Sequence, residues 1–284
     1  MSDQSNPSPP TSSPLPGPKV LIMGESGTGK TYSIRTLAEA GLEVFVLFTE
    51  NGQETLGDTD PAQVHWTYIP PAPPSFGEML QMAKLVNTLS LKALSDHQDN
   101  TRSKHNQFYQ MLSALTDFKC ERTGESFGPV DSFGPGRALV IDSLSGLSLA
   151  AMSLVVGGRP VRSQADWQIA MNMLEGFLNK LCFLQSTVVV TSHVEREVDE
   201  VSGGTSIMAS TLGRKLAPKI PRFFSDTIHA QRSGGKFFWA TDTNGMSLKT
   251  RNLPIGGNIP PTFTQIISTW QSRGGILTKE LPAQ

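Results

Sequence analysis

The segment Val20–Gly41 reads VLIMGESGTGKTYSIRTLAEAG and contains the pattern Gly-x-x-x-x-Gly-Lys-Thr at Gly24–Thr31. Its glycines allow a backbone curl in which several N–H groups point at one phosphate. Lys30 adds a positive charge that reaches the outer phosphates, and the Thr31 hydroxyl suits a magnesium ion. The whole loop is therefore predicted to bind a nucleoside triphosphate through Gly24, Glu25, Ser26, Gly27, Thr28, Gly29, Lys30 and Thr31.

Apolar and helical patterns on both sides of this loop indicate an α/β fold. The short apolar run Lys19–Met23 predicts a buried strand, and Thr31–Ala40 has helical spacing closed by a glycine. Strands that alternate with helices imply a three-layer sandwich with a mostly parallel central sheet, whose ligands bind beyond the carboxyl ends of the strands. The other predicted strands are Val44–Phe48, Ala138–Ile141, Thr187–Thr191, Thr227–Ala230, Phe237–Ala240 and Met246–Leu248, and the other predicted helices are Phe76–Leu94 and Asp166–Phe183.

Composition limits the class of protein. The 284 residues suit one large domain, expected over 19–271, and the formal charge of -1 argues against a nucleic-acid-binding surface over the whole chain while permitting a local basic face. Two cysteines exclude a disulfide framework and favour a reducing cytoplasm. No apolar run approaches the roughly 20 residues that span a bilayer, so no membrane is expected as a partner.

Three polar segments are expected to lie outside the packed core. Residues 1–18 consist almost wholly of small, polar and proline residues, which cannot bury enough apolar area to fold, and they are predicted to be a disordered tail. Residues 272–284 are expected to be a flexible C-terminal tail. Residues 95–136 are polar and glycine-rich, and we interpret them as an exposed insertion with a small hairpin.

Polar residues at the ends of three predicted strands complete a candidate catalytic site. Asp142 follows Ala138–Ile141, where a carboxylate forms a second magnesium anchor, although an aspartate at that position is also common in turns. Glu50 follows the second strand and is predicted to orient or deprotonate the attacking water. Glu25 competes for that role, but its side chain is expected to point to solvent. His193, at the tip of the fourth strand, is predicted to sense the γ-phosphate.

In this order the motifs resemble the RecA-like P-loop ATPase core, and more narrowly the compact phage-encoded AAA/RecA-type nucleotide-binding proteins, over about residues 19–268. The resemblance implies that ATP is the nucleotide, that Thr31 and Asp142 hold Mg2+, and that Glu50 is the base. His193 stands where RecA proteins usually have glutamine. No aromatic residue near Glu50–Asp60 clearly suits adenine stacking, so ATP rather than GTP rests on the resemblance alone.

The resemblance also implies that assembly completes the catalytic site. Paired basic residues of the family, matched here by Lys249 and Arg251 in SLKTRNLP, reach the γ-phosphate of the neighbouring subunit and neutralise charge in the transition state. The sequence shows no such residue close to the chain's own P-loop. A homo-oligomer is therefore expected, the alternative being that these two residues form surface salt bridges.

Two DNA-binding loops are a further implication of the resemblance. The first matches Leu154–Asp166, with Arg159 and Arg162 beside flexible glycines, and the second matches Glu195–Lys215. Between residues 202 and 251, eight Lys and Arg face two Asp, a net charge of +6 that would attract a phosphate backbone. Neither loop carries an aromatic residue for base stacking.

The expected function is a DNA-dependent ATPase that assembles on single-stranded DNA during phage or bacterial recombination, annealing or replication. A nucleotide-gated module that recruits a protein partner with little turnover is the main alternative. A small-molecule or nucleoside kinase, and a packaging motor, fit the remaining motifs less well.

Overall fold

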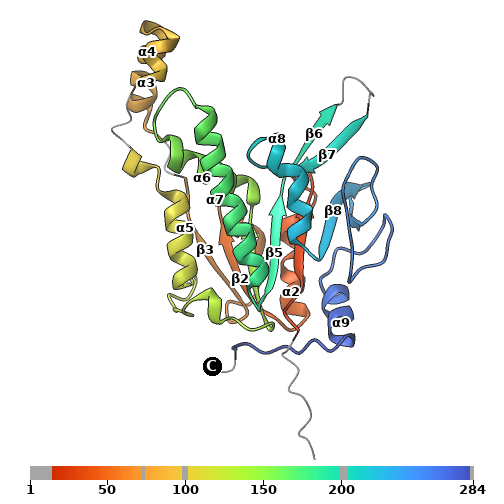
Figure 1. Ribbon diagram of the computed structural model, residues 1–284. Coiled ribbons are helices and arrows are strands. Elements are labelled where there is room, and N and C mark those ends of the chain that lie inside the picture. The colour runs from red at the N-terminus through yellow and green to blue at the C-terminus, as the bar shows by residue number, and fades with distance from the viewer. Residues whose placement is uncertain (1–14, 72–73, 98–101, 199–203, 282–284) are drawn as a thin grey trace, which may run out of the picture.

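The protein is seen here as a computed structural model, which describes residues 15–71, 74–97, 102–198 and 204–281 (Figure 1). Within these residues a seven-stranded sheet has the order β3-β2-β4-β5-β1-β8-β9. Its pairs are parallel except for β8 with β9, so the prediction of an α/β fold with a mostly parallel central sheet is confirmed. The strands are β1 Lys19–Met23, β2 Glu43–Phe48, β3 Val64–Tyr68, β4 Arg137–Asp142, β5 Thr187–Ser192, β8 Asp226–Ser233 and β9 Lys236–Ala240.

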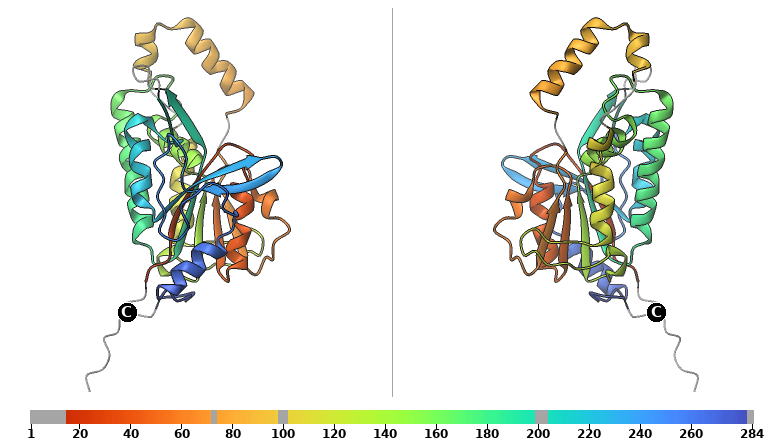
Figure 2. Two further views of the ribbon diagram at one scale, coloured as in Figure 1. Left: turned by 90° about the vertical axis from the view of Figure 1, so that its right-hand side faces the viewer. Right: turned by 90° about the vertical axis from the view of Figure 1, so that its left-hand side faces the viewer.

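Helices cover both faces of the sheet, as Figure 2 shows from its two sides. Successive residues of a strand point to opposite faces, so Leu21 and Met23 enter one core while Val20 and Ile22 enter the other. The first core is covered by α5 Gln107–Thr116, α6 Leu144–Val156 and α7 Gln164–Phe183, and the second by α1 Lys30–Ser33, α2 Arg35–Glu39 and α9 Thr264–Ser272. The sheet with helices packed on each of its two faces forms the three layers that were expected.

The sheet order brings the predicted site residues to one edge. Because β1, β5, β4 and β2 are neighbours and run parallel, their carboxyl ends lie side by side. The P-loop follows β1, Glu50 is the second residue after β2, Asp142 ends β4 and His193 follows β5. Four segments far apart in the sequence therefore meet at this edge.

Two predicted helices are each divided in two. The helix expected over Thr31–Ala40 is interrupted at Ile34 between α1 and α2. The one expected over Phe76–Leu94 ends with α3 at Thr88, and Ser90 then caps the short helix α4 Leu91–Ser95 by accepting a hydrogen bond from the Ala93 N–H. The α3–α4 arm stands away from the body of the molecule, and no α3 side chain is buried (Figure 2).

Several elements were not predicted from the sequence. These are β3, the helices α5, α6 and α9, the short helix α8 Gly213–Leu216, and a separate antiparallel hairpin of β6 Val194–Val198 and β7 Thr205–Ala209. The predicted strand Met246–Leu248 is wrong: only isolated bridges form there, from Ile207 to Met246 and from Thr227 to Lys249. Short 3-10 helices lie at η1 Gln53–Leu56, η2 Arg102–Lys104, η3 Val130–Ser132 and η4 Ala217–Phe223.

The segment 95–136 is exposed only in part. Its helix α5 packs against α6 and buries Phe108 and Met111, and Phe118 and Phe133 also belong to the core. The bridge between Lys119 and Ser126 closes the small hairpin that was expected there.

Parts of the two expected tails contact the body of the protein. The Trp270 indole N–H donates to the Pro16 carbonyl, and Leu277 packs against the second core. The N–H groups of Gly134 and Gly136 donate to the carbonyls of residues 279 and 278. Residues 1–14 and 282–284 lie outside the described residues. Among the residues that are described, none of the helices combines the length and apolar character that a bilayer span requires.

Lys19, at the start of β1, is a buried lysine whose ionisation opposes folding. Its Nζ donates to the carbonyls of Gly17 and Ser186 at 2.7 and 2.8 Å. Burial lowers its pKa to about 8, and the charge on nearby Cys182 opposes that shift. Between pH 8 and 10.5 the native state therefore binds fewer protons than the unfolded state, so the contribution of Lys19 to stability improves as the pH rises.

We expect the free energy of unfolding of the wild type, measured against Lys19→Met by urea denaturation, to gain up to about 3 kcal/mol between pH 7 and pH 10.5. Below pH 8 the penalty is fully present, because Lys19 is protonated in both states, and it is lost progressively as the pH rises from the folded pKa of about 8 to the unfolded value of 10.5. The exposed Lys180→Met is the control. If the difference in free energy of unfolding between the wild type and Lys19→Met stays constant with pH, this prediction is contradicted.

Candidate functional site

Two glycines give the P-loop its curl. Gly27 and Gly29 have φ values of 74° and 82°, which side chains other than glycine rarely adopt. At Gly24 the constraint is space, since an added Cβ would lie 2.5 Å from the carbonyl oxygen of Ala230 on β8. The loop glycines are thus required by backbone geometry, as the motif predicts.

Lys30 places its ammonium inside this curl. The Nζ atom donates to the carbonyls of Gly24 and Glu25, both at 2.8 Å, and the residue is 7% exposed. Burial lowers the pKa of Lys30, while the negative charges of Asp142, Glu50 and Glu25 oppose that shift. The ammonium is held at the position that a phosphate-binding lysine requires.

Thr31 and Asp142 meet although 111 residues separate them. The Thr31 hydroxyl donates to Asp142 Oδ2 at 2.7 Å, and the Thr191 hydroxyl donates to the other carboxylate oxygen. Burial raises the pKa of Asp142, and hydrogen bonds from Thr191 and Thr31 act against this. A carboxylate and a hydroxyl oxygen are ligands that Mg2+ accepts together with substrate phosphates, so the pair fits the predicted ion.

Glu50 is fixed by two polar neighbours. Ser143 Oγ donates to Glu50 Oε1 at 2.7 Å, and His193 Nε2 lies 3.3 Å from Glu50 Oε2. Behind it, the Thr49 hydroxyl donates to the Ser143 carbonyl and accepts from the Ser143 N–H, which ties the end of β2 to the end of β4. These contacts orient the carboxylate, as the predicted role of general base requires.

The rival carboxylate, Glu25, has a different environment. Its side chain is 57% exposed, as expected, and it lies 3.3 Å from the guanidinium of Arg196 on β6. Arg196 therefore lies beside the P-loop of its own chain, while the expectation that no residue of this chain acts there as an arginine finger stays a prediction. Sequence reasoning missed Arg196 because 171 residues separate it from Glu25 and only the β6–β7 hairpin brings them together.

A cavity of about 410 Å³ opens over the P-loop, a size that suits a small-molecule ligand. Most of the predicted site residues line it, together with two aromatic residues that the sequence analysis missed, Tyr32 and Phe237. Its lining consists of Ser26, Gly27, Thr28, Gly29, Lys30, Thr31, Tyr32, Glu50, Asn51, Thr55, Asp142, His193 and Phe237.

Phe237 reaches the cavity from β9. A Cβ added to Gly29 would lie 3.0 Å from the Phe237 ring, and the Arg232 guanidinium is 5.3 Å from the ring centroid. The second aromatic ring is that of Tyr32 on α1, and it lies 4.0 Å from the Arg35 guanidinium. The cavity therefore offers aromatic faces on which a nucleobase can stack. Phe237 was missed from the sequence because β9 is distant from the P-loop along the chain.

Lys249 and Arg251 lie away from this cavity. Lys249 forms an isolated antiparallel β-bridge with Thr227. The carboxylate of buried Asp226 accepts a hydrogen bond from the backbone N–H of Arg251. In the register of β1 with β8, Asp226 pairs with Val20, at the opposite end from the P-loop. The two residues do not reach the P-loop of their own chain, and their action on a neighbouring subunit stays a prediction.

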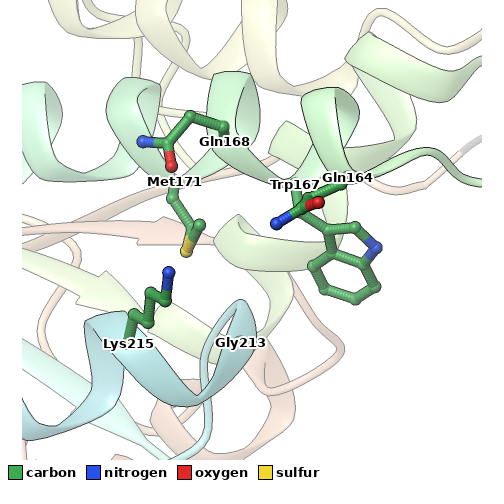
Figure 3. A pocket seen from close by; sticks show the side chains of 6 residues that line it. All are labelled: Gln164, Trp167, Gln168, Met171, Gly213 and Lys215. Atoms are coloured by element: carbon green, nitrogen blue, oxygen red, sulfur yellow. The ribbon is translucent and has the colours of Figure 1, made fainter.

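A second cavity, of about 380 Å³, lies between α7 and α8. Figure 3 shows the Trp167 indole and the Lys215 ammonium on different sides of it. A smaller cavity lined by Lys215 and Lys219 adjoins it, and the Arg162 guanidinium lies 5.8 Å from the Trp167 ring centroid. We call this surface the α7–α8 groove; it is lined by Gln164, Trp167, Gln168, Met171, Gly213 and Lys215.

The groove forms where the two predicted DNA-binding loops end. Leu154–Asp166 runs into α7, and Glu195–Lys215 runs into α8. Arg159 does not line the groove, because its guanidinium donates to Asp166 Oδ1 at 2.6 Å. Trp167, missed because it lies one residue beyond the first loop, supplies the aromatic ring that the loops lack. Residues 199–203 and the side chain of Arg214 lie outside the described part of the chain.

Comparison with known proteins gives one family match. A family model described as an AAA domain matches residues 16–253. Of the solved structures, 56 chains match. One of them, described as a prototypical ATPase from the type III secretion system of pathogenic bacteria, has a TM-score of 0.38 and 13% identity. That match covers 76% of this chain and 53% of the other, so this chain spans about half its length. No curated protein matches.

Proposed function

This chain belongs to the AAA-domain family, and on that basis we propose that it hydrolyses ATP with Mg2+ at the P-loop cavity and couples hydrolysis to single-stranded DNA. The family match confirms the P-loop ATPase core expected from the sequence. One observation carries the catalytic proposal: the Thr31–Asp142 hydrogen bond of 2.7 Å lies in the cavity that also holds Lys30 and Glu50. The site thus contains a phosphate-binding lysine, a magnesium-binding pair and a candidate base.

Each residue has a defined task in this proposal. The P-loop backbone and Lys30 bind the phosphates, while Thr31 and Asp142 hold Mg2+, which neutralises phosphate charge when bound. Glu50 orients or deprotonates the attacking water, and His193 senses the state of the nucleotide through its contact with Glu50. Tyr32 and Phe237 offer stacking faces to the base.

The α7–α8 groove supports the DNA half of the proposal. An indole ring with Arg162 beside it, together with Lys215 and Lys219, gives the mixture of stacking and phosphate-binding groups that single strands require. The groove also connects to the nucleotide site. The Ser145 hydroxyl accepts the N–H of His193 and donates to the carbonyl of Ser210, just before α8.

Self-assembly on DNA, with roles in recombination, annealing or replication, belongs to the same proposal. Lys249 and Arg251 do not reach the cavity of their own chain and have the spacing of the family's inter-subunit pair. Measuring ATP turnover with and without single-stranded DNA, over a range of protein concentrations, tests both parts. Turnover per molecule that is independent of DNA and of concentration would reject them, and tight nucleotide binding without turnover would favour the nucleotide-gated binding module.

We expect Trp167→Ala to weaken binding to single-stranded DNA about tenfold, because loss of base stacking costs roughly 1–3 kcal/mol. Lys215→Ala should also weaken binding, because it removes a contact to a phosphate. Lys215→Ala should also reduce the slope of log affinity against log salt by about one. Fluorescence anisotropy across a salt titration measures both effects. Phe183→Ala and Lys180→Ala, exposed residues of the same helix α7, are the matched controls. If the affinity for single-stranded DNA changes neither with salt concentration nor with either groove substitution, the groove is ruled out as a DNA site.

A further inference from the structure

Arg196 brings a second positive charge to the P-loop. Its Nη2 atom lies 3.3 Å from Glu25 Oε1, while Lys30 Nζ donates to the backbone carbonyl of the same glutamate at 2.8 Å. The two cations therefore converge on one residue of the loop. The side chains of the Arg196–Glu25 pair are 65% and 57% exposed, so this is an open ion pair at the surface.

The nucleotide cavity is short of positive charge. Among the described residues that line it, Lys30 is the lone Lys or Arg, whereas Glu50 and Asp142 are carboxylates. A triphosphate adds several negative charges, and phosphoryl transfer is accelerated when a further cation stabilises the charge that develops. A second cation close to the phosphates would correct this imbalance within one chain.

We propose that Arg196 is that cation: it binds the phosphates of a nucleotide held in its own P-loop, and Glu25 holds the guanidinium beside the loop when no nucleotide is bound. The inference rests on the proposed ATPase function but needs neither DNA binding nor assembly. An exposed ion pair contributes little to stability, so little opposes its exchange. A guanidinium binds phosphate through two parallel hydrogen bonds, which makes the new contact stronger than the old one.

The position of Arg196 on the hairpin links this exchange to the rest of the molecule. Strand β6 begins directly after His193, and Arg196 pairs in register with Ile207 of β7, whose N–H donates to the Gly245 carbonyl. At the base of the hairpin the Ser210 N–H donates to the His193 carbonyl at 2.8 Å. From Ser210 the chain continues into α8 and the α7–α8 groove (Figure 1). Arg196 therefore senses the nucleotide from an element that leads directly to the groove.

Nucleotide binding to the full chain, measured without DNA, tests the assignment. The probes are Mg-ADP alone and Mg-ADP with aluminium fluoride, which imitates the transferring phosphoryl group. We expect Arg196→Ala to weaken binding of the aluminium fluoride complex by about tenfold or more, since a hydrogen bond to a charged group is lost, and to change ADP affinity less. Arg196→Lys should restore part of that affinity. Lys180→Ala removes an exposed cation paired with Asp131 and is the control.

Glu25→Gln separates a phosphate contact from a purely structural ion pair. If Arg196 binds phosphate, the substitution frees the guanidinium and removes a negative charge, so the aluminium fluoride complex binds more tightly. Equal weakening by Glu25→Gln and Arg196→Ala would overturn the proposal, as would an Arg196→Ala variant with wild-type affinities. In that last case a wild type that still binds Mg-ADP leaves the ATPase proposal standing. A wild type that binds no magnesium nucleotide would instead overturn both.

Discussion

Lys30→Ala is expected to lower kcat/KM for ATP hydrolysis by at least about 100-fold, because loss of one preorganised charged donor costs about that factor or more. The ammonium lies within the P-loop, 2.8 Å from two of its carbonyls, and it lines the cavity that contains Thr31 and Glu50. Removing it leaves the phosphates without the cation closest to the loop. Steady-state ATP turnover and nucleotide binding measure the effect.

Circular dichroism and the thermal midpoint show whether Lys30→Ala keeps its fold. The exposed Lys84→Ala, on α3, removes the same charge away from the cavity and should hydrolyse ATP at the wild-type rate. A folded Lys30→Ala protein with an unchanged rate would remove the catalytic role of the P-loop. Loss of activity in both variants would point to net charge rather than to the site.

The elements predicted correctly from the sequence are those whose apolar pattern matches the way their side chains are buried in the structure. The strands at β1, β2, β4 and β5 are short apolar runs buried on both faces, and each was found within one or two residues of its bounds. Helix α6 was missed because its segment LSGLSLAAMSLVV is apolar on nearly every side and lacks the period that marks a half-exposed helix. Strand β3 was missed because it has no long apolar run. Its second half is only partly buried in the structure.

Helix α3 shows the opposite limitation. Its apolar residues recur at helical spacing, and a helix forms there, although it ends at Thr88, with a capping box from Ser75 to Glu78. Yet Met79, Leu80 and Val86 remain about half exposed. A periodic pattern shows which face of a helix is apolar, but not whether another element of the same chain covers it.

For the candidate site, sequence reasoning found the residues that follow strand ends and missed those delivered by hairpins and helix faces. Glu50, Asp142 and His193 follow or end strands that a parallel sheet brings together, so their meeting could be inferred. Phe237 and Arg196 depend on how the β8–β9 and β6–β7 hairpins fold over the P-loop. No local pattern carries that information.

Glu50→Gln is expected to keep nucleotide binding near the wild-type level while lowering kcat by about 100-fold or more, the usual contribution of a general base. A glutamine can still accept the hydrogen bond from Ser143, which is 2.7 Å long in the wild type, so the end of β2 keeps its position. What it loses is the ability to take a proton. Single-turnover hydrolysis together with Mg-ATP binding separates the two steps.

The two glutamates near the P-loop, Glu50 and Glu25, differ in a way that makes this substitution decisive. Glu50 faces the cavity and is held by Ser143 and His193, whereas Glu25 is paired with Arg196 on the outside of the loop. Hydrolysis at the wild-type rate in Glu50→Gln, with activity lost in Glu25→Gln, would transfer the role of base to Glu25. If both single variants hydrolyse ATP normally, the water is oriented by other groups, and His193, which lies 3.3 Å from Glu50 and lines the same cavity, is the next candidate.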